Sequence, residues 1–179
     1  MRSHKTDVTK IQAAPNRAAI ALGSNLGDSR STLEQALQTL AQMPAVTLLA
    51  QSHWYQTKPV GPPQPDYING CAVVQTQLDP EQLLENLLEI ENQYGRVRAQ
   101  RWGARTLDLD LILFGDRVID TPKLQLPHPR MGERAFVLRP LADIAPNWVD
   151  PMTHCTIAQL LAQISCTDLH PLAATPSKN

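Results

Sequence analysis

The sequence predicts an α+β domain of the ferredoxin-like class, a βαββαβ sandwich with helices packed on an antiparallel sheet, plus a C-terminal extension. Three observations lead to this prediction. Apolar segments follow one another in the order strand, helix, strand, strand, helix, strand. The 179 residues are enough for one well-buried domain, whereas two would each be small. Hydrophobic residues make up 42% and charged residues 18%, a balance typical of globular chains.

The first strand and helix have clear boundaries. A short apolar run over 18–22 predicts a buried strand, which a glycine turn ends. Asp28 or Ser29 can cap the helix that follows, and leucines recur at helical spacing until Pro44 ends it. Segment 46–55 is the next strand candidate.

The second half of the pattern begins with a rigid connection. Four prolines in 57–65 exclude regular structure there and stiffen the loop before a strand over 67–77. Asp79-Pro80 starts the second helix, whose apolar residues form a broad face. A strand over 106–114 closes the unit.

Signals weaken after Gly115. A short hairpin is expected within 118–126, the segment 134–141 is ambiguous between helix and strand, and 156–164 predicts a last helix. The polar, patternless ends of the chain indicate frayed termini. We therefore expect a disordered N-terminal extension over 1–16, a single domain over 17–166 and a flexible tail over 167–179.

Charge and cysteine content narrow the class of protein. The formal net charge of -1 excludes a global basic field that would attract nucleic acid or an acidic membrane. Cys71, Cys155 and Cys166 fit neither a disulfide framework nor a metal knuckle. No segment resembles a signal peptide or a membrane span, so we expect a soluble, cytoplasmic protein.

The strongest functional signal is a pair of carboxylates, Asp108 and Asp110, within an apolar strand. Side chains two residues apart on a strand share a face, so both carboxylates project together. Their repulsion and desolvation require a compensating cation. Mg²⁺ fits, because one or two carboxylates plus substrate phosphates usually hold it. The alternative for this pair alone is a strand with its polar face in solvent.

A basic loop leads directly into this pair. Arg96, Arg98, Arg101 and Arg105 lie within ten residues, together with Trp102 and flanking glycines. Arginine forks bind phosphate oxygens in a bidentate manner, and glycines let such a loop bend. An isolated basic loop is often only solvated. Beside the carboxylates, however, it favours a site for a nucleotide triphosphate and its metal.

His128 lies between two prolines, in a rigid loop that suits a hydrogen-bond donor to phosphate, although an exposed loop histidine is equally compatible with this position. The chain lacks the G-x-x-x-x-G-K-[ST] phosphate loop and the protein-kinase motifs. Any use of ATP therefore involves another scaffold.

Read together, several motifs resemble one family over roughly 18–146. The sequence is similar to the 6-hydroxymethyl-7,8-dihydropterin pyrophosphokinase family, also called 2-amino-4-hydroxy-6-hydroxymethyldihydropteridine diphosphokinase. The motifs are Ala21-Leu22-Gly23-Ser24-Asn25-Leu26-Gly27, Pro65-Asp66-Tyr67-Ile68-Asn69, Arg96-Val97-Arg98, Arg101-Trp102-Gly103, Arg105-Thr106-Leu107-Asp108-Leu109-Asp110, Leu126-Pro127-His128-Pro129-Arg130-Met131 and Arg134-Ala135-Phe136-Val137-Leu138-Arg139-Pro140.

The resemblance implies a ferredoxin-like enzyme of folate biosynthesis that transfers pyrophosphate from ATP to 6-hydroxymethyl-7,8-dihydropterin and releases AMP. It implies two Mg²⁺ ions held by both carboxylates, and a pterin ring stacked between two aromatic side chains. The implied catalytic residues are Arg96, Arg105, Asp108 and Asp110. The implied ATP-binding residues are Glu91, Arg98, Trp102, Leu111, His128 and Arg134. The implied pterin-binding residues are Thr57, Val60, Tyr67, Asn69, Trp102 and Phe136.

Two alternatives stay open from the residues alone. One is a ferredoxin-like nucleic-acid-binding module that uses the loop from Arg96 to Arg105. The acidic pair after the loop and the near-neutral net charge argue against it. The other is a different Mg²⁺-dependent nucleotide hydrolase or transferase on the same carboxylates. We expect small-molecule substrates, no nucleic-acid or membrane partner, and a monomer.

Overall fold

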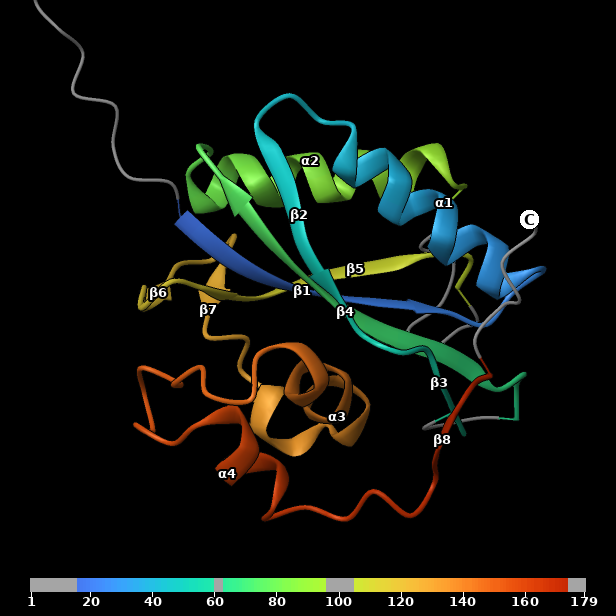
Figure 1. The fold of residues 1–179 in the computed structure, drawn as a ribbon. Coiled ribbons are helices and arrows are strands. Elements are labelled where there is room, and N and C mark those ends of the chain that lie inside the picture. The colour runs from blue at the N-terminus through green and yellow to red at the C-terminus, as the bar shows by residue number, and fades with distance from the viewer. Residues whose placement is uncertain (1–15, 60–62, 96–104, 174–179) are drawn as a thin grey trace, which may run out of the picture.

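The structure is a computed structural model that describes residues 16–59, 63–95 and 105–173 (Figure 1). Strands and helices alternate in the order expected for the first two thirds of the chain. In chain order the main elements are β1 (Asn16–Ser24), α1 (Ser29–Ala41), β2 (Val46–Gln51), β3 (Tyr55–Thr57), β4 (Tyr67–Thr76), α2 (Pro80–Gln93), β5 (Asp108–Phe114), β6 (Ile119–Asp120), β7 (Gln125–Leu126), α3 (Ala135–Ile144), α4 (Ile157–Leu161) and β8 (Leu169–Pro171).

An antiparallel sheet organises the domain around β1. Strand β1 pairs with β4 on one side and with β5 on the other. Strands β2 and β3 pair with successive parts of β4, and β8 continues the sheet beyond β3. Sheet and helices confirm the predicted ferredoxin-like α+β class.

Helices cover both faces of the sheet. Helices α1 and α2 lie on one face, and the C-terminal helices α3 and α4 lie on the other (Figure 1). Side chains along β1 alternate between the two faces of the sheet. Ile20 and Leu22 pack toward α1 and α2, whereas Ala19 and Ala21 belong to the core on the opposite face. The segment 134–141, ambiguous in sequence, belongs mainly to α3, which the second core stabilises.

Local capping explains where the first two helices begin. The Asp28 side chain accepts a hydrogen bond from the backbone N–H of Ser31 at 3.1 Å. At α2, Asp79 and Gln82 form a reciprocal capping box with Pro80 in the first turn. These contacts satisfy backbone donors that a helix start leaves without partners. Among the described residues, no helix is long and apolar enough to cross a membrane.

Three features differ from the sequence expectations. The candidate strand over 46–55 is divided into β2 and β3, with Trp54 buried between them. Strand β8 lies within the tail that was expected to be flexible, where it pairs with β3. Asn16, expected to be disordered, begins β1. Pairing with distant strands stabilises these end segments, and local composition does not reveal such partners.

Candidate active site

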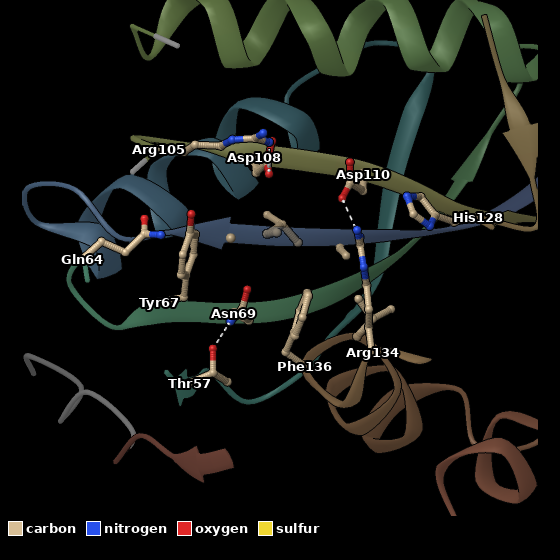
Figure 2. A pocket seen from close by; sticks show the side chains of 14 residues that line it. Thr57, Gln64, Tyr67, Asn69, Arg105, Asp108, Asp110, His128, Arg134 and Phe136 are labelled. Atoms are coloured by element: carbon tan, nitrogen blue, oxygen red, sulfur yellow. Dashed lines mark hydrogen bonds and ion pairs between the residues drawn. The ribbon is translucent and has the colours of Figure 1, made fainter. Parts of the chain in front are cut away.

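A cavity of about 260 Å³ opens on the α3 side of the sheet. Strands β1, β4 and β5 form its floor, and the start of α3 forms one wall (Figure 2). Nine of the residues predicted for the site line it together: Thr57, Tyr67, Asn69, Arg105, Asp108, Asp110, His128, Arg134 and Phe136.

The carboxylate pair projects from β5 into this cavity, as its spacing predicts. In the sheet register Asp108 lies opposite Gly23 and Asp110 lies opposite Ala21, so both carboxylates share the face covered by α3. Their side chains are 22% and 40% exposed, respectively. They are therefore accessible to a ligand while they stay within the protein wall.

Each carboxylate faces an arginine. One guanidinium nitrogen of Arg105 contacts both oxygens of Asp108, at 2.8 and 2.6 Å. A guanidinium nitrogen of Arg134 lies 3.7 Å from an oxygen of Asp110. Burial of the guanidinium tends to lower the pKa of Arg105, but Asp108, Tyr67 and Asp110 together raise it above its usual value. Burial lowers the pKa of Arg134, which Asp110 partly opposes.

The donor set suits a hard cation that shares its coordination with substrate. Within the described ranges, no group of three or more His, Cys, Asp or Glu side chains could hold a metal ion alone. The same-face pair Asp108 and Asp110 nevertheless supplies carboxylate oxygens beside open space. Mg²⁺ commonly binds in this way and completes its octahedron with water and phosphate oxygens. The residues present therefore fit a phosphate-bridged metal.

His128 lies at the carboxylate end of the cavity (Figure 2). Burial lowers its pKa, against the opposing effect of Asp110, so the neutral imidazole is favoured near pH 7. Its Nδ1 accepts a hydrogen bond from the backbone N–H of Arg130 at 3.2 Å. The proton of the neutral ring then belongs on Nε2, which makes His128 a hydrogen-bond donor.

Two aromatic residues and an amide form the other half of the cavity. Tyr67 of β4 and Phe136 of α3 lie on either side of Asn69 (Figure 2). The Asn69 Nδ2 donates to the Thr57 hydroxyl at 2.7 Å, which fixes the amide orientation. Burial raises the pKa of Tyr67, so its phenol stays neutral. The arrangement suits a flat ring with polar edges.

Gly23 leaves the floor of the cavity open between the two halves. It lies opposite Asp108 on one side and opposite Asn69 on the other. A Cβ at this position would lie 2.9 Å from the Asn69 Oδ1, which is closer than Cβ atoms in proteins approach other heavy atoms. From the sequence alone, this turn is mainly a structural connection between strand and helix, whereas the sheet register places Gly23 in the site.

Asn25 connects three segments around the cavity and was not predicted as a site residue. Its side chain donates to Gln64 Oε1 and to the Pro65 carbonyl, both at 3.0 Å. Its Oδ1 accepts from the Arg105 backbone N–H at 2.8 Å. Gln64 itself lines the cavity. The only sequence signal for Asn25 is a polar residue directly after a buried strand. Its partners are distant in the sequence, so this signal does not predict its contacts.

Two residues predicted to bind ATP are not among those that line the cavity. Leu111 is 3% exposed and belongs to the core beneath α1 and α2. Glu91 of α2 is 1% exposed, and its Oε1 accepts from the backbone N–H of Leu109 at 2.6 Å. This contact anchors β5 at the residue between the two aspartates. Four other predicted residues, Val60, Arg96, Arg98 and Trp102, lie outside the described residues.

The fold and the cavity together define a class of protein: an α+β domain with one small-molecule site that combines two carboxylates, arginines and a space between Tyr67 and Phe136. Comparison with known families shows which family has these features. Residues 19–146 match the model of the family described as 7,8-dihydro-6-hydroxymethylpterin-pyrophosphokinase. The chain belongs to this family.

Relatives named 2-amino-4-hydroxy-6-hydroxymethyldihydropteridine pyrophosphokinase are similar over most of their length. The protein of Synechocystis sp. is 48% identical over 156 residues, which cover 87% of this chain and 80% of that protein. The Haemophilus influenzae protein is 44% identical over 149 residues, 83% of this chain and 92% of that protein.

A solved structure supports the fold. The Plasmodium falciparum protein titled HPPK-DHPS wild type with Pteroate has a TM-score of 0.69 at 15% identity. The match covers 83% of this chain and 42% of that chain, so the present chain spans less than half of the solved protein. At this identity the likeness concerns the fold alone.

Proposed function

We propose that this protein transfers pyrophosphate from ATP to 6-hydroxymethyl-7,8-dihydropterin, giving AMP and the pterin diphosphate, a step of folate biosynthesis. Family membership and the named relatives support this activity. The observation that carries it in the structure is the union of two half-sites in one cavity: Asp108 and Asp110 at one end, Tyr67, Asn69 and Phe136 at the other.

The two alternative functions explain less of this arrangement. A nucleic-acid-binding module has no use for two carboxylates in its binding face, because they would repel a polyanion. A hydrolase acting on nucleotides would not require the aromatic slot. Neither alternative accounts for the family match over 19–146.

ATP is the co-substrate, and its reaction requires a metal. We assign the metal ligands to Asp108 and Asp110, and propose two Mg²⁺ ions. When bound, the metal would neutralise phosphate charge and align the phosphates. Arg105 and Arg134 line the same end, so they would exchange carboxylate oxygens for phosphate oxygens as substrate enters. His128 would donate its Nε2–H to a phosphate oxygen.

The remaining predicted nucleotide residues keep their proposed roles. Arg96 would stabilise charge on the transferred group, while Arg98 and Trp102 would belong to a loop that closes over the site. Glu91 would affect ATP binding indirectly: it accepts a hydrogen bond from the Leu109 N–H and so holds β5, which carries Asp108 and Asp110. For Leu111, whose side chain is buried in the core, the backbone is the part left to contact ATP.

The acceptor would lie between Tyr67 and Phe136, with the pterin edge on Asn69. Because Asn69 Nδ2 is engaged by Thr57, its Oδ1 is the atom available to accept from the ring N–H groups. Val60 and Trp102 would complete the pocket. This pose directs the hydroxymethyl group across Gly23 toward the carboxylate end.

In the proposed reaction the acceptor hydroxyl oxygen forms a bond to the β-phosphorus of ATP. The bond between that phosphorus and the oxygen bridging to the α-phosphate breaks, AMP leaves with that oxygen, and the hydroxyl proton passes to solvent. We assign no general base. The chain contributes mainly by positioning both substrates and by electrostatic stabilisation. We further propose a cytoplasmic monomer with one catalytic domain over 17–166.

Analysis of the nucleotide product tests this function. The purified protein with ATP and Mg²⁺ should form AMP and pterin diphosphate in equal amounts, and only when the hydroxymethyl pterin is added. Stoichiometric ADP would refute pyrophosphate transfer. AMP or phosphate release without the pterin would instead support the hydrolase alternative.

A further inference from the structure

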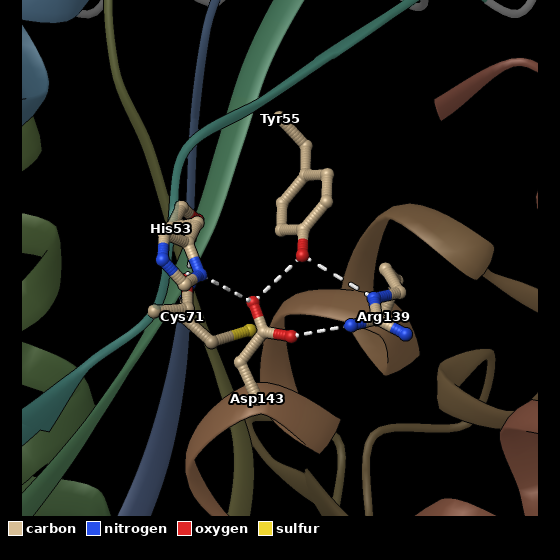
Figure 3. Close-up of polar contacts among 6 residues, drawn as sticks. His53, Tyr55, Cys71, Arg139 and Asp143 are labelled. Carbon is tan, nitrogen blue, oxygen red and sulfur yellow. Dashed lines mark hydrogen bonds and ion pairs between the residues drawn. The ribbon is translucent and has the colours of Figure 1, made fainter. Parts of the chain in front are cut away.

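A partly buried polar cluster joins β3 to α3 (Figure 3). Its centre is Asp143 of α3, whose side chain is 9% exposed. The Tyr55 hydroxyl of β3 donates to Asp143 Oδ2 at 2.7 Å, and Arg139 Nη2 donates to Oδ1 at 2.8 Å. Arg139 Nε also donates to the Tyr55 oxygen at 3.2 Å. We call Tyr55, Arg139 and Asp143 the Asp143 cluster.

The Asp143 cluster joins the two walls that would hold the acceptor ring. Phe136, Arg139 and Asp143 follow one another at helical spacing of three and four residues, so one face of α3 carries all of them. On the other wall, Tyr55 lies opposite Asn69 in the sheet register, and Thr57 lies two residues further along β3. The cluster thus ties the helix of Phe136 to the strands of Asn69 and Thr57.

Side-chain ties matter here because the backbone of α3 is interrupted. Pro140 lies inside α3 and has no N–H, so it cannot donate the helical hydrogen bond to the Phe136 carbonyl. A second side-chain tie reaches the same turn, where the Cys71 thiol of β4 contacts the Val137 carbonyl at 3.5 Å. Val137 itself lines the cavity.

The chemistry of the Asp143 cluster suits residues that hold α3 in one position relative to β3 better than residues that only stabilise the fold. Tyr55 and the Asp143 carboxylate are buried, whereas the Arg139 side chain is 45% exposed. A buried charged group often adds no more stability than apolar residues of the same shape, but its directional bonds hold one geometry. Burial raises the pKa of Tyr55, so its hydroxyl remains a donor to Asp143 throughout the neutral range. His53 contacts Asp143 at 3.3 Å, but its side chain is 74% exposed and contributes little constraint.

We propose that Tyr55, Arg139 and Asp143 are positioning residues that fix Phe136 relative to Asn69 and thereby determine affinity for the flat acceptor ring. This inference rests on the proposed function. None of these three residues lines the cavity, so each acts through the cavity residues that it holds. The effect should be larger for the acceptor than for ATP, because Asp108 and Asp110 lie on β5, which none of the three residues contacts. At the carboxylate end, Arg134 lies at the start of α3, two residues before Phe136.

Steady-state kinetics of the full chain test the proposal. Tyr55→Phe removes one hydroxyl, and Asp143→Asn removes the charge while it keeps the shape. We expect the acceptor KM to rise about threefold to tenfold in each, from the loss of about one hydrogen bond. The ATP KM and kcat should change by less than about twofold. Asp143→Glu, which restores the charge, should recover part of the acceptor affinity.

Gln56→Ala is the matched control. Gln56 lies on the same strand, is exposed, and donates to Asp66 at 2.9 Å, so its loss removes a hydrogen bond without touching the cluster. It should leave both KM values unchanged. An unchanged acceptor KM in Tyr55→Phe, or equal rises in both KM values, would overturn the proposal. If Asp143→Asn does not fold, Tyr55→Phe carries the test. Absence of AMP formation by the unmodified chain would refute the proposed function instead.

Discussion

Gly23→Ala should damage the active site while it spares the fold. The backbone of Gly23 is not in the left-handed region, so alanine is conformationally allowed there. Its Cβ, however, would lie 2.9 Å from Asn69 Oδ1 and 4.0 Å from Tyr67 Cδ1. Asn69 must therefore move, although its Nδ2 is bound to Thr57 at 2.7 Å.

The expected magnitudes follow from these contacts. Weakening the bond between Asn69 and Thr57 costs about 1 kcal/mol. Alanine gains about 0.5–1 kcal/mol over glycine in a strand through lower unfolded-state entropy. These effects nearly cancel, so the free energy of unfolding should change by less than about 1 kcal/mol. Misplacement of a contacting group should lower kcat/KM for the acceptor by roughly tenfold to a hundredfold.

Gly70→Ala provides the contrasting variant. Gly70 is the next residue along β4 from Asn69, but its added Cβ would lie 2.5 Å from two ring atoms of Trp54. Trp54 is buried in the core on the opposite face, so overpacking should cost about 1–3 kcal/mol. Urea unfolding and acceptor kinetics on both variants separate the effects. Normal kinetics in Gly23→Ala, or a stability loss equal to that of Gly70→Ala, would refute the reasoning.

Three further predictions address other parts of the molecule. Asp110→Asn should lower Mg²⁺-dependent turnover by about a hundredfold or more. Its melting temperature should stay unchanged, because the Asp110 side chain is 40% exposed. Retained turnover in product assays would exclude Asp110 as a metal ligand. The lowered pKa of His128 means that the unfolded chain binds the proton more readily, so metal-free stability should fall as pH drops through about 6.5 and below. His128→Gln should flatten this part of the unfolding profile, and an unaltered slope would contradict the assignment. Truncation after Cys166 removes β8 and the hydrogen bond from the Leu172 N–H to the Trp54 carbonyl, which should cost about 2 kcal/mol; an unchanged urea midpoint would show that β8 contributes nothing.

Local patterns predicted much of the fold because their causes are local. The capping box of Asp79 and the proline after it mark the start of α2 without reference to any other segment. Alternation along β5 places Asp108 and Asp110 on one face, and the structure confirms this. The same alternation places the side chain of Leu111 on the other face, away from the cavity.

Features that depend on distant partners could not be predicted in this way. Segment 134–141 is ambiguous alone and becomes helical where it buries Val137 and Leu138 against the sheet. Strand β8 exists because β3 offers a free edge, which the composition of the tail does not reveal. Likewise, Asn25 forms hydrogen bonds with Pro65 and Arg105, which lie on two loops that meet only in the folded chain.

The sequence by itself determined the class of fold, the acidic pair, the adjoining arginines and the family, because spacing and residue type are properties of short segments. Only the tertiary structure decided that Arg105 and Arg134 each face one aspartate, that Gly23 keeps the cavity floor open, and that Asp143 ties two walls together. These relations join residues far apart in the chain, and packing of the sheet against α3 brings them within contact distance.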